Sequence, residues 1–207
     1  MRSLRTLAAV AFGLLLAAGT ATADTVVYKI DSSHSQVGFS IRHFFSKVPG
    51  KFKTYEGTIS LDPKDLSKTV VEVTIDTASI DTGNGDRDSH LQSSDFFDAA
   101  KFPKITFKST SVTSQSATKA TLKGELNMHG VTKPVTLDAE VLGSSPERSG
   151  FEAKTKINRQ DFGISWNKVV EGGGSVLSDE VEITINIEGV RPKPATPAPP
   201  AAPPKKN

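Results

Sequence analysis

The chain has 207 residues, with 25 Lys and Arg against 23 Asp and Glu, a formal net charge of +2. It contains no cysteine, which excludes disulfides, cysteine-ligated metal centres and a thiol nucleophile. The length suits one domain, or at most two small ones.

The N-terminal segment 1–23 is predicted to be a secretory signal peptide. Two arginines precede an uncharged apolar stretch from Leu7 to Gly19, and Ala21-Thr22-Ala23 offers a small-residue cleavage motif before Asp24. The stretch is shorter than the roughly 20 residues that a spanning helix needs. An uncleaved N-terminal anchor is the alternative. We therefore expect an exported protein that resides in the periplasm, with secretion as a second destination.

The segment 24–190 is predicted to be one all-β domain. Its apolar and polar residues alternate with a period of two, which is typical of strands with one buried face. Turn residues separate most of these strands, at Val48-Pro49-Gly50, at Leu61 to Lys64, at His129 to Thr132 and at Gly143 to Gly150. Eight segments show the alternation: 37–41, 55–61, 71–75, 105–107, 120–128, 135–141, 151–157 and 181–187.

Short connections between successive strands predict antiparallel neighbours. Because each strand has only one apolar face, the sheet can bury that face by closing on itself. An eight-stranded up-and-down barrel has room for side chains or for one small ligand. A two-sheet sandwich would bury the same faces and is the rival fold.

Two long connections interrupt the pattern. In the first, 76–104, we expect helical turns at 86–92 and again at 94–98. The second, 158–178, contains the only tryptophan, Trp166. Apolar aromatic residues in long irregular connections favour a lid or plug over the open end of a core.

The C-terminal segment 191–207 is rich in proline and is predicted to be an exposed tail without sheet or helix structure. A spacer that faces the cell wall and a tolerated extension are the two interpretations. The tail and the signal peptide together carry six basic residues and no acid, so the segment 24–190 has a net charge of −4. The basic character therefore gives no support to nucleic-acid binding.

Five separated motifs carry a resemblance to a known family. They are Asp31 to His43 (DSSHSQVGFSIRH), Gly50 to Gly57 (GKFKTYEG), Arg87 to Asp98 with Phe102 to Ser109 (RDSHLQSSDFFD and FPKITFKS), Gly124 to Val135 (GELNMHGVTKPV) and Asn158 to Asn167 (NRQDFGISWN). On these motifs the chain resembles the YceI-like family of exported lipocalin-like proteins. The resemblance covers nearly all of 24–190, whereas the proline-rich tail is not part of the family pattern.

The resemblance implies an eight-stranded antiparallel barrel with an elongated apolar cavity. It also implies that this cavity binds a polyisoprenoid, a quinone or another long lipid-like chain in the periplasm. A surplus of rings agrees with it, since 11 Phe and one Trp stand beside only two Tyr. Ordinary core packing of the rings is the alternative. The residues predicted to line the cavity are Phe39, Ile41, Leu91, Phe96, Phe97, Phe102, Phe107, Leu126, Met128, Phe162, Ile164 and Trp166.

Three arginines and one histidine are candidates to hold a polar head group: Arg42, Arg87, Arg159 and His90. A guanidinium binds a phosphate or carboxylate through two parallel hydrogen bonds. The competing interpretation for Arg87 and Arg159 is a structural ion pair, because each lies near an Asp in the sequence.

No catalytic or metal motif is complete. The four histidines lack metal-ligand spacing, and Gly163-Ile164-Ser165-Trp166 lacks the second glycine of a nucleophile elbow. We therefore predict a non-catalytic binding protein without metal or cofactor, a monomer or homodimer that sequesters or carries its lipid. An enzyme that acts on a similar lipid is the alternative function, and a stress or adhesion module is a weaker third.

Overall fold

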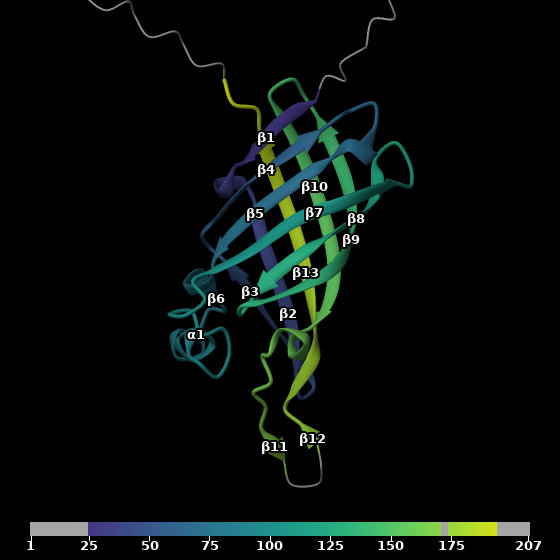
Figure 1. The fold of residues 1–207 in the computed structure, drawn as a ribbon. Helices are drawn as coiled ribbons and strands as arrows, with labels where there is room; N and C mark the ends of the chain where they lie inside the picture. The colour runs from purple at the N-terminus through teal and green to yellow at the C-terminus, as the bar shows by residue number, and fades with distance from the viewer. Residues whose placement is uncertain (1–24, 171–173, 194–207) are drawn as a thin grey trace, which may run out of the picture.

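The structure is a computed structural model that describes residues 25–170 and 174–193. The predicted signal peptide and most of the proline-rich tail lie outside the described residues. Within them, antiparallel strands wrap into one closed barrel (Figure 1). The strands are β1 Val26–Ile30, β2 Gln36–His43, β3 Ser46–Phe52, β4 Tyr55–Leu61, β5 Val70–Asp76, β6 Ile80–Asp81, β7 Lys104–Ser114, β8 Lys119–Met128, β9 Val131–Ser144, β10 Arg148–Asn158, β11 Val169–Val170, β12 Gly174–Ser175 and β13 Leu177–Val190. β11 and β12 pair only with each other and are not part of the barrel sheet.

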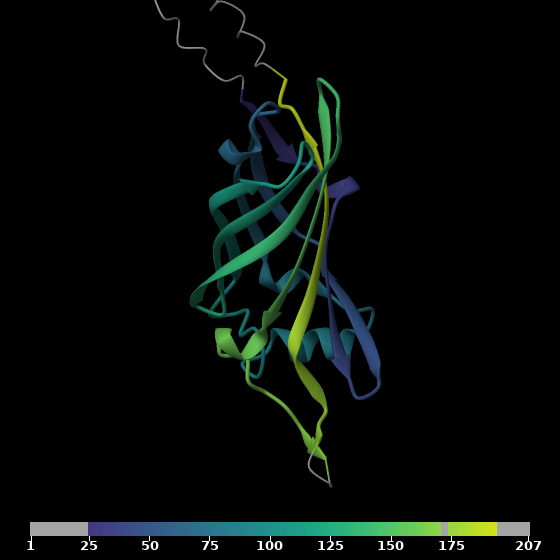
Figure 2. The same cartoon turned by 90° about the vertical axis from the view of Figure 1, so that its right-hand side faces the viewer.

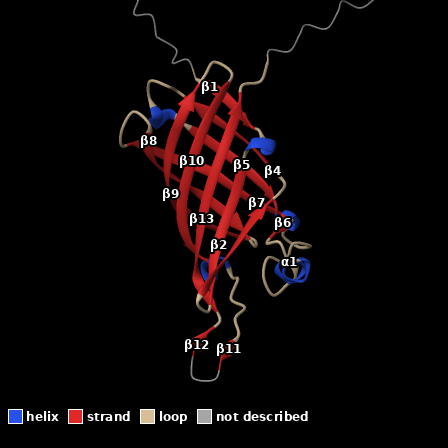
Figure 3. Cartoon of the chain, turned by 180° about the vertical axis from the view of Figure 1, so that it is seen from behind, coloured by secondary structure: helices blue, strands red, loops and turns tan. Residues whose placement is uncertain are grey.

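The barrel wall consists of eight long strands, three of which are interrupted. The first wall strand consists of β1 and β2, which both pair with β13. The second consists of β3, which pairs with β2, and β4, which pairs with β1. The third consists of β5, which pairs with β4, and β6, which pairs with β3. β7, β8, β9, β10 and β13 complete the wall in chain order. Lys29 of β1 pairs with Val190 of β13 and closes the ring. The predicted eight-stranded antiparallel barrel is confirmed, and the sandwich is excluded because the sheet closes (Figure 3).

One predicted turn is wrong. Val48, Pro49 and Gly50 lie inside β3, and the chain reverses instead at Phe44 and Phe45, between the paired residues His43 and Ser46. Pro49 is tolerated in the strand because β6 pairs only with Lys51 and Phe52, so β3 has no second neighbour at Pro49 and needs no N–H there. The sequence pattern failed here because proline and glycine are typical of turns and also of strand edges.

Four 3₁₀ turns and one α-helix accompany the strands: η1 Ser32–His34, η2 Leu66–Lys68, η3 Thr77–Ser79, α1 Gly85–Gln92 and η4 Arg159–Phe162. The helix confirms the turn expected at 86–92, and Asn84 caps it by accepting a hydrogen bond from the Arg87 amide at 2.9 Å. The segment 94–98 forms turns rather than a helix. Helix α1, the β2–β3 hairpin and β11–β12 lie at the barrel end opposite the first and last described residues (Figure 2).

Candidate functional site: an apolar cavity inside the barrel

A cavity of about 480 Å³ occupies the barrel interior. Its lining is mostly aliphatic and aromatic, and every one of the eight wall strands contributes to it. Leu177 and Ile187 lie toward the two ends of β13 and both line it. At about 3.3 Å per residue they are roughly 30 Å apart along the strand, so the cavity is elongated.

The interior side chains do not fill this space. Val181, Ile183 and Ile185 point inward on β13 but are only partly buried, since they face the cavity rather than packed neighbours. The Phe39 ring lies over Gly50, its partner in the β2–β3 pair. A Cβ atom at Gly50 would lie 2.3 Å from Cζ of that ring, so the missing side chain allows the ring to lie against the wall.

Ten of the twelve residues predicted to line the cavity do so. They come from separated parts of the chain, and the barrel brings them to one surface: Phe39, Ile41, Leu91, Phe96, Phe97, Phe107, Leu126, Met128, Ile164 and Trp166.

Phe102 and Phe162 are not in the lining, contrary to the sequence prediction. The Phe102 ring packs edge-on against His129, with the centroids 4.9 Å apart. Phe162 is 1% exposed within the packed core, and its carbonyl bonds Nδ1 of His129 at 3.0 Å. The Phe102 ring thus packs the first long connection against the β8–β9 turn, and the Phe162 carbonyl ties η4 to the same turn. Aromatic composition alone does not reveal these contacts.

His90 lies at the α1 end of the cavity and lines it. Its Nε2 is 2.9 Å from a carboxylate oxygen of Asp95, and its ring meets the rings of Phe96 and Trp166 edge-on at 5.0 and 5.1 Å. Trp166 belongs to the second long connection. The two irregular segments thus meet at one end of the barrel, as the lid interpretation requires.

Arg159 has a structural role. It is buried, and its guanidinium donates to the carbonyls of Ser178, Ile164 and Trp166 at 3.0, 2.8 and 2.8 Å, with Asp179 at 3.3 Å. Burial lowers the pKa of Arg159 below its usual value. Its donors are used within the chain, which favours the structural interpretation over head-group binding.

The other two arginines differ in position. Arg42 is exposed and is not in the cavity lining, so the structure gives no support to its head-group role. Arg87 lines the α1 end and bonds the side chain and carbonyl of Thr82 at 2.7 and 2.9 Å. Its Nη1 has no hydrogen-bond partner in the described part of the chain. Of the four head-group candidates, Arg87 and His90 therefore remain at this end.

Sequence reasoning missed a polar atom nearer the other end. The Thr69 hydroxyl is buried, belongs to a residue that lines the cavity, and has no hydrogen-bond partner among the described residues. A buried hydroxyl without a partner is unfavourable unless a ligand or water bonds it. No sequence signal marked it, because a threonine just before a strand is ordinary.

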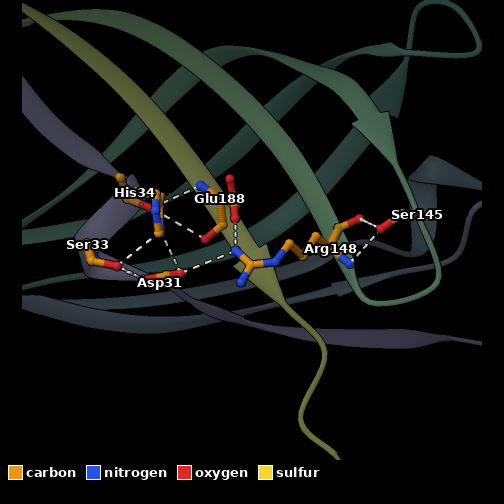
Figure 4. A network of polar contacts seen from close by, with 7 residues as sticks. Asp31, Ser33, His34, Ser145, Arg148 and Glu188 are labelled. Atoms are coloured by element: carbon orange, nitrogen blue, oxygen red, sulfur yellow. Dashed lines mark hydrogen bonds and ion pairs between the residues drawn. The ribbon is translucent and has the colours of Figure 1, made fainter.

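A polar cluster lies on the wall near the ends of the described chain (Figure 4). Ligand atoms of Asp31, His34 and Glu188 all lie within 4.8 Å of one another. However, the Arg148 guanidinium pairs with Glu188 and lies 3.5 Å from Asp31, so a side-chain cation already occupies the place beside both carboxylates. Hydrogen bonds from Ser33 and His34 hold the pKa of Asp31 well below its usual 3.8. We assign this cluster to cross-linking of η1, β10 and β13.

The same cluster is not a catalytic relay. The Ser33 hydroxyl and the Asp31 carboxylate both meet Nδ1 of His34, at 3.1 and 3.0 Å. A relay needs the nucleophile and the acid on opposite ring nitrogens. None of these three residues lines the cavity.

No helix in the described ranges is long and apolar enough to cross a bilayer. The sequence profile of the YceI-like domain matches residues 28–189. Protein YceI of Escherichia coli O157:H7 is 40% identical over 188 residues, which cover 87% of this chain and 94% of that protein.

Solved structures agree with this match. The barrel is similar to BcnA of Burkholderia cenocepacia, with a TM-score of 0.69, 25% identity and coverage of 77% of this chain and 98% of that one. It also shares its fold with a polyisoprenoid binding domain from Saccharophagus degradans, with a TM-score of 0.63, 18% identity and coverage of 81% and 99%. With its profile match and its relatives, the chain belongs to the YceI-like family.

Proposed function

We propose that this protein binds a polyisoprenoid or another long lipid-like chain inside the barrel and sequesters or carries it in the periplasm, without catalysis. The observation that carries the proposal is the hollow apolar interior of about 480 Å³. Protein interiors are ordinarily packed as densely as organic crystals.

The energetics favour an occupied cavity. On the scale of core cavities, about 24 cal/mol per Å³, an empty space of this size costs about 12 kcal/mol. That cost is comparable with the whole folding free energy of a domain. A bound chain offsets it, since each buried CH₂ group contributes about 0.8 kcal/mol. A long chain thus gains affinity from its length and needs few polar contacts.

Two further observations support this assignment. The neighbour from Saccharophagus degradans, described as a polyisoprenoid binding domain, has the same fold. The predicted signal peptide supports export. The cavity lining carries His90, whose ring pairs with Asp95. No hydroxyl bonds that ring among the described residues, which favours binding over the enzymatic alternative.

Organic extraction and mass spectrometry of the purified protein test the proposal. We expect a co-purifying chain lipid, or saturable uptake of an added polyprenol after extraction. Ala153→Phe places a ring in the cavity and should reduce uptake, whereas the control Lys154→Phe places it on the adjacent exposed position. Repeated absence of lipid together with no uptake, or equal uptake by the two variants, would overturn the proposal.

A further inference from the structure

Two exposed phenylalanines form the tip of the β2–β3 hairpin. Phe45 has a relative exposure of 103% and Phe44 of 45%, and their rings stack with centroids 6.4 Å apart. Phe45 is the most exposed large apolar side chain in the described part of the chain. Rings placed in water at the end of a projecting hairpin contribute nothing to the core.

The turn itself does not favour phenylalanine. Phe44 is the first of two loop residues and has a φ of 51°, in the left-handed region. Two-residue hairpin turns with positive φ favour Gly, Asn or Asp, because a bulky side chain is strained in that conformation. Neither core packing nor turn geometry therefore explains why rings occupy this tip.

The hairpin is locally basic. The segment 40–54 contains four basic residues, Arg42, Lys47, Lys51 and Lys53, and no acid, although the segment 24–190 as a whole has a net charge of −4. Lys47 pairs with Glu182 at 2.6 Å and Lys53 with Asp81 at 3.8 Å, whereas Arg42 and Lys51 have no ion pair within the described ranges. Exposed rings flanked by cations are complementary to an anionic lipid surface.

The tip is physically connected to the cavity. The ring of Phe44 meets the ring of His43, which lines the cavity, at 4.9 Å. The Phe44 amide donates to the carbonyl of Val176 at 2.9 Å, directly before the lining residue Leu177. The hairpin lies at the same barrel end as α1 (Figure 2). Contact through this tip would bring the His90 end of the cavity to the contacted surface.

We propose that Phe44 and Phe45, with Arg42 and Lys47, dock the barrel on an anionic phospholipid bilayer. The inference deepens the proposed function, on which it rests, because it states where the barrel would exchange its lipid chain. The rings insert among the acyl chains at the interface, and the cations contact the head groups. The opposite end of the barrel stays in water.

Co-sedimentation with vesicles of phosphatidylglycerol and phosphatidylcholine tests the docking. The wild-type protein should bind these vesicles, and more weakly those of phosphatidylcholine alone. Phe45→Ser should lower the partition coefficient about tenfold or more, and Arg42→Gln about fivefold. The control Leu142→Ser replaces an apolar side chain of 59% exposure on β9, away from the proposed tip. This control should not change the partition coefficient.

Phe44→Gly separates docking from folding. Glycine adopts positive φ without strain, so this variant should unfold at a higher temperature than wild type while it binds vesicles more weakly. Loss of binding with gained stability supports a tip whose rings serve contact with lipid rather than folding. A variant that binds as well as wild type would overturn the proposal.

Two other results would also overturn it. In one, Phe45→Ser and Leu142→Ser reduce vesicle binding equally. In the other, the wild-type protein binds no vesicles and forms a dimer, and Phe45→Ser dissociates that dimer. This result would assign the tip to contact with a second copy of the chain. Uptake of a polyprenol presented in cyclodextrin, without vesicles, distinguishes failure of membrane docking from failure of the proposed lipid binding. Phe45→Ser should still take up the polyprenol if the cavity binds lipid.

Discussion

The hydrogen-bond partners of two arginines in this barrel indicate which of them is available to a ligand and which has a structural role. Arg159 and Arg87 both line the cavity, but Arg159 satisfies its donors with three carbonyls and Asp179, whereas Arg87 keeps Nη1 unbonded within the described chain. A buried cation with four protein partners is held by the fold. The exposed guanidinium of Arg87, at the end of the cavity, can still bind a ligand.

Arg159→Gln tests this assignment. The substitution leaves the carbonyls of Ile164, Trp166 and Ser178 with fewer donors in a buried place. We expect a loss of at least about 2 kcal/mol in the free energy of unfolding, measured in urea. The exposed control Arg42→Gln should stay within about 0.5 kcal/mol of wild type. Unchanged stability with abolished lipid uptake would instead assign Arg159 to the head group.

Strand pairs, rather than single strands, keep the barrel hollow. Phe39 lies over Gly50 across the β2–β3 pair, and Phe107 lies over Gly124 across β7 and β8, where an added Cβ would be 2.3 and 2.4 Å from the ring. The glycines provide space against the wall for the rings. A large inward side chain thus contributes apolar surface without filling the cavity.

Gly50→Val should push the Phe39 ring into the cavity. We expect the affinity for a polyprenol to fall about tenfold, since overpacking of this kind costs about 1–3 kcal/mol. Phe39→Ala in the same chain should restore binding, and the control Gly143→Val, where nothing lies within 4 Å of an added Cβ, should not alter it. Fluorescence titration measures all three. Failure of Phe39→Ala to rescue would contradict the mechanism.

At the scale of the whole molecule, the ligand would act as part of the core. The chain has no cysteine, so disulfides contribute nothing to its stability. Many inward aliphatic residues remain only partly buried around the cavity. We therefore expect the stability of this protein to depend on the ligand that it binds.

Lipid removal should therefore lower the unfolding temperature. A ligand present at 100 times its Kd stabilises the native state by about 2.7 kcal/mol. We expect the extracted protein to unfold at a lower temperature than the protein as purified, and added polyprenol to restore the difference. Differential scanning calorimetry measures both steps. Equal unfolding temperatures before and after extraction, with lipid loss verified by mass spectrometry, would contradict this expectation.

The class of the fold and ten of the residues that line the cavity could be predicted from the sequence. Alternation with a period of two indicates which side chains share a face of the sheet. A closed antiparallel sheet can place only one of its faces inside. Ten of twelve predicted lining residues follow from that rule and the family motifs. The reversal at Phe44 and Phe45 was missed, because Pro49 and Gly50 carry the stronger local turn signal.

Which groups are free to contact a ligand follows from tertiary contacts that no sequence pattern reveals. Phe102 and Phe162 pack beside His129, Arg159 bonds carbonyls, and Phe39 lies over a glycine on another strand. Each outcome depends on strand register and on backbone atoms, which side-chain type does not encode. Composition gives the number of aromatic and cationic side chains. The pairing of distant segments determines whether such a side chain packs in the core, lines the cavity or lies outside it.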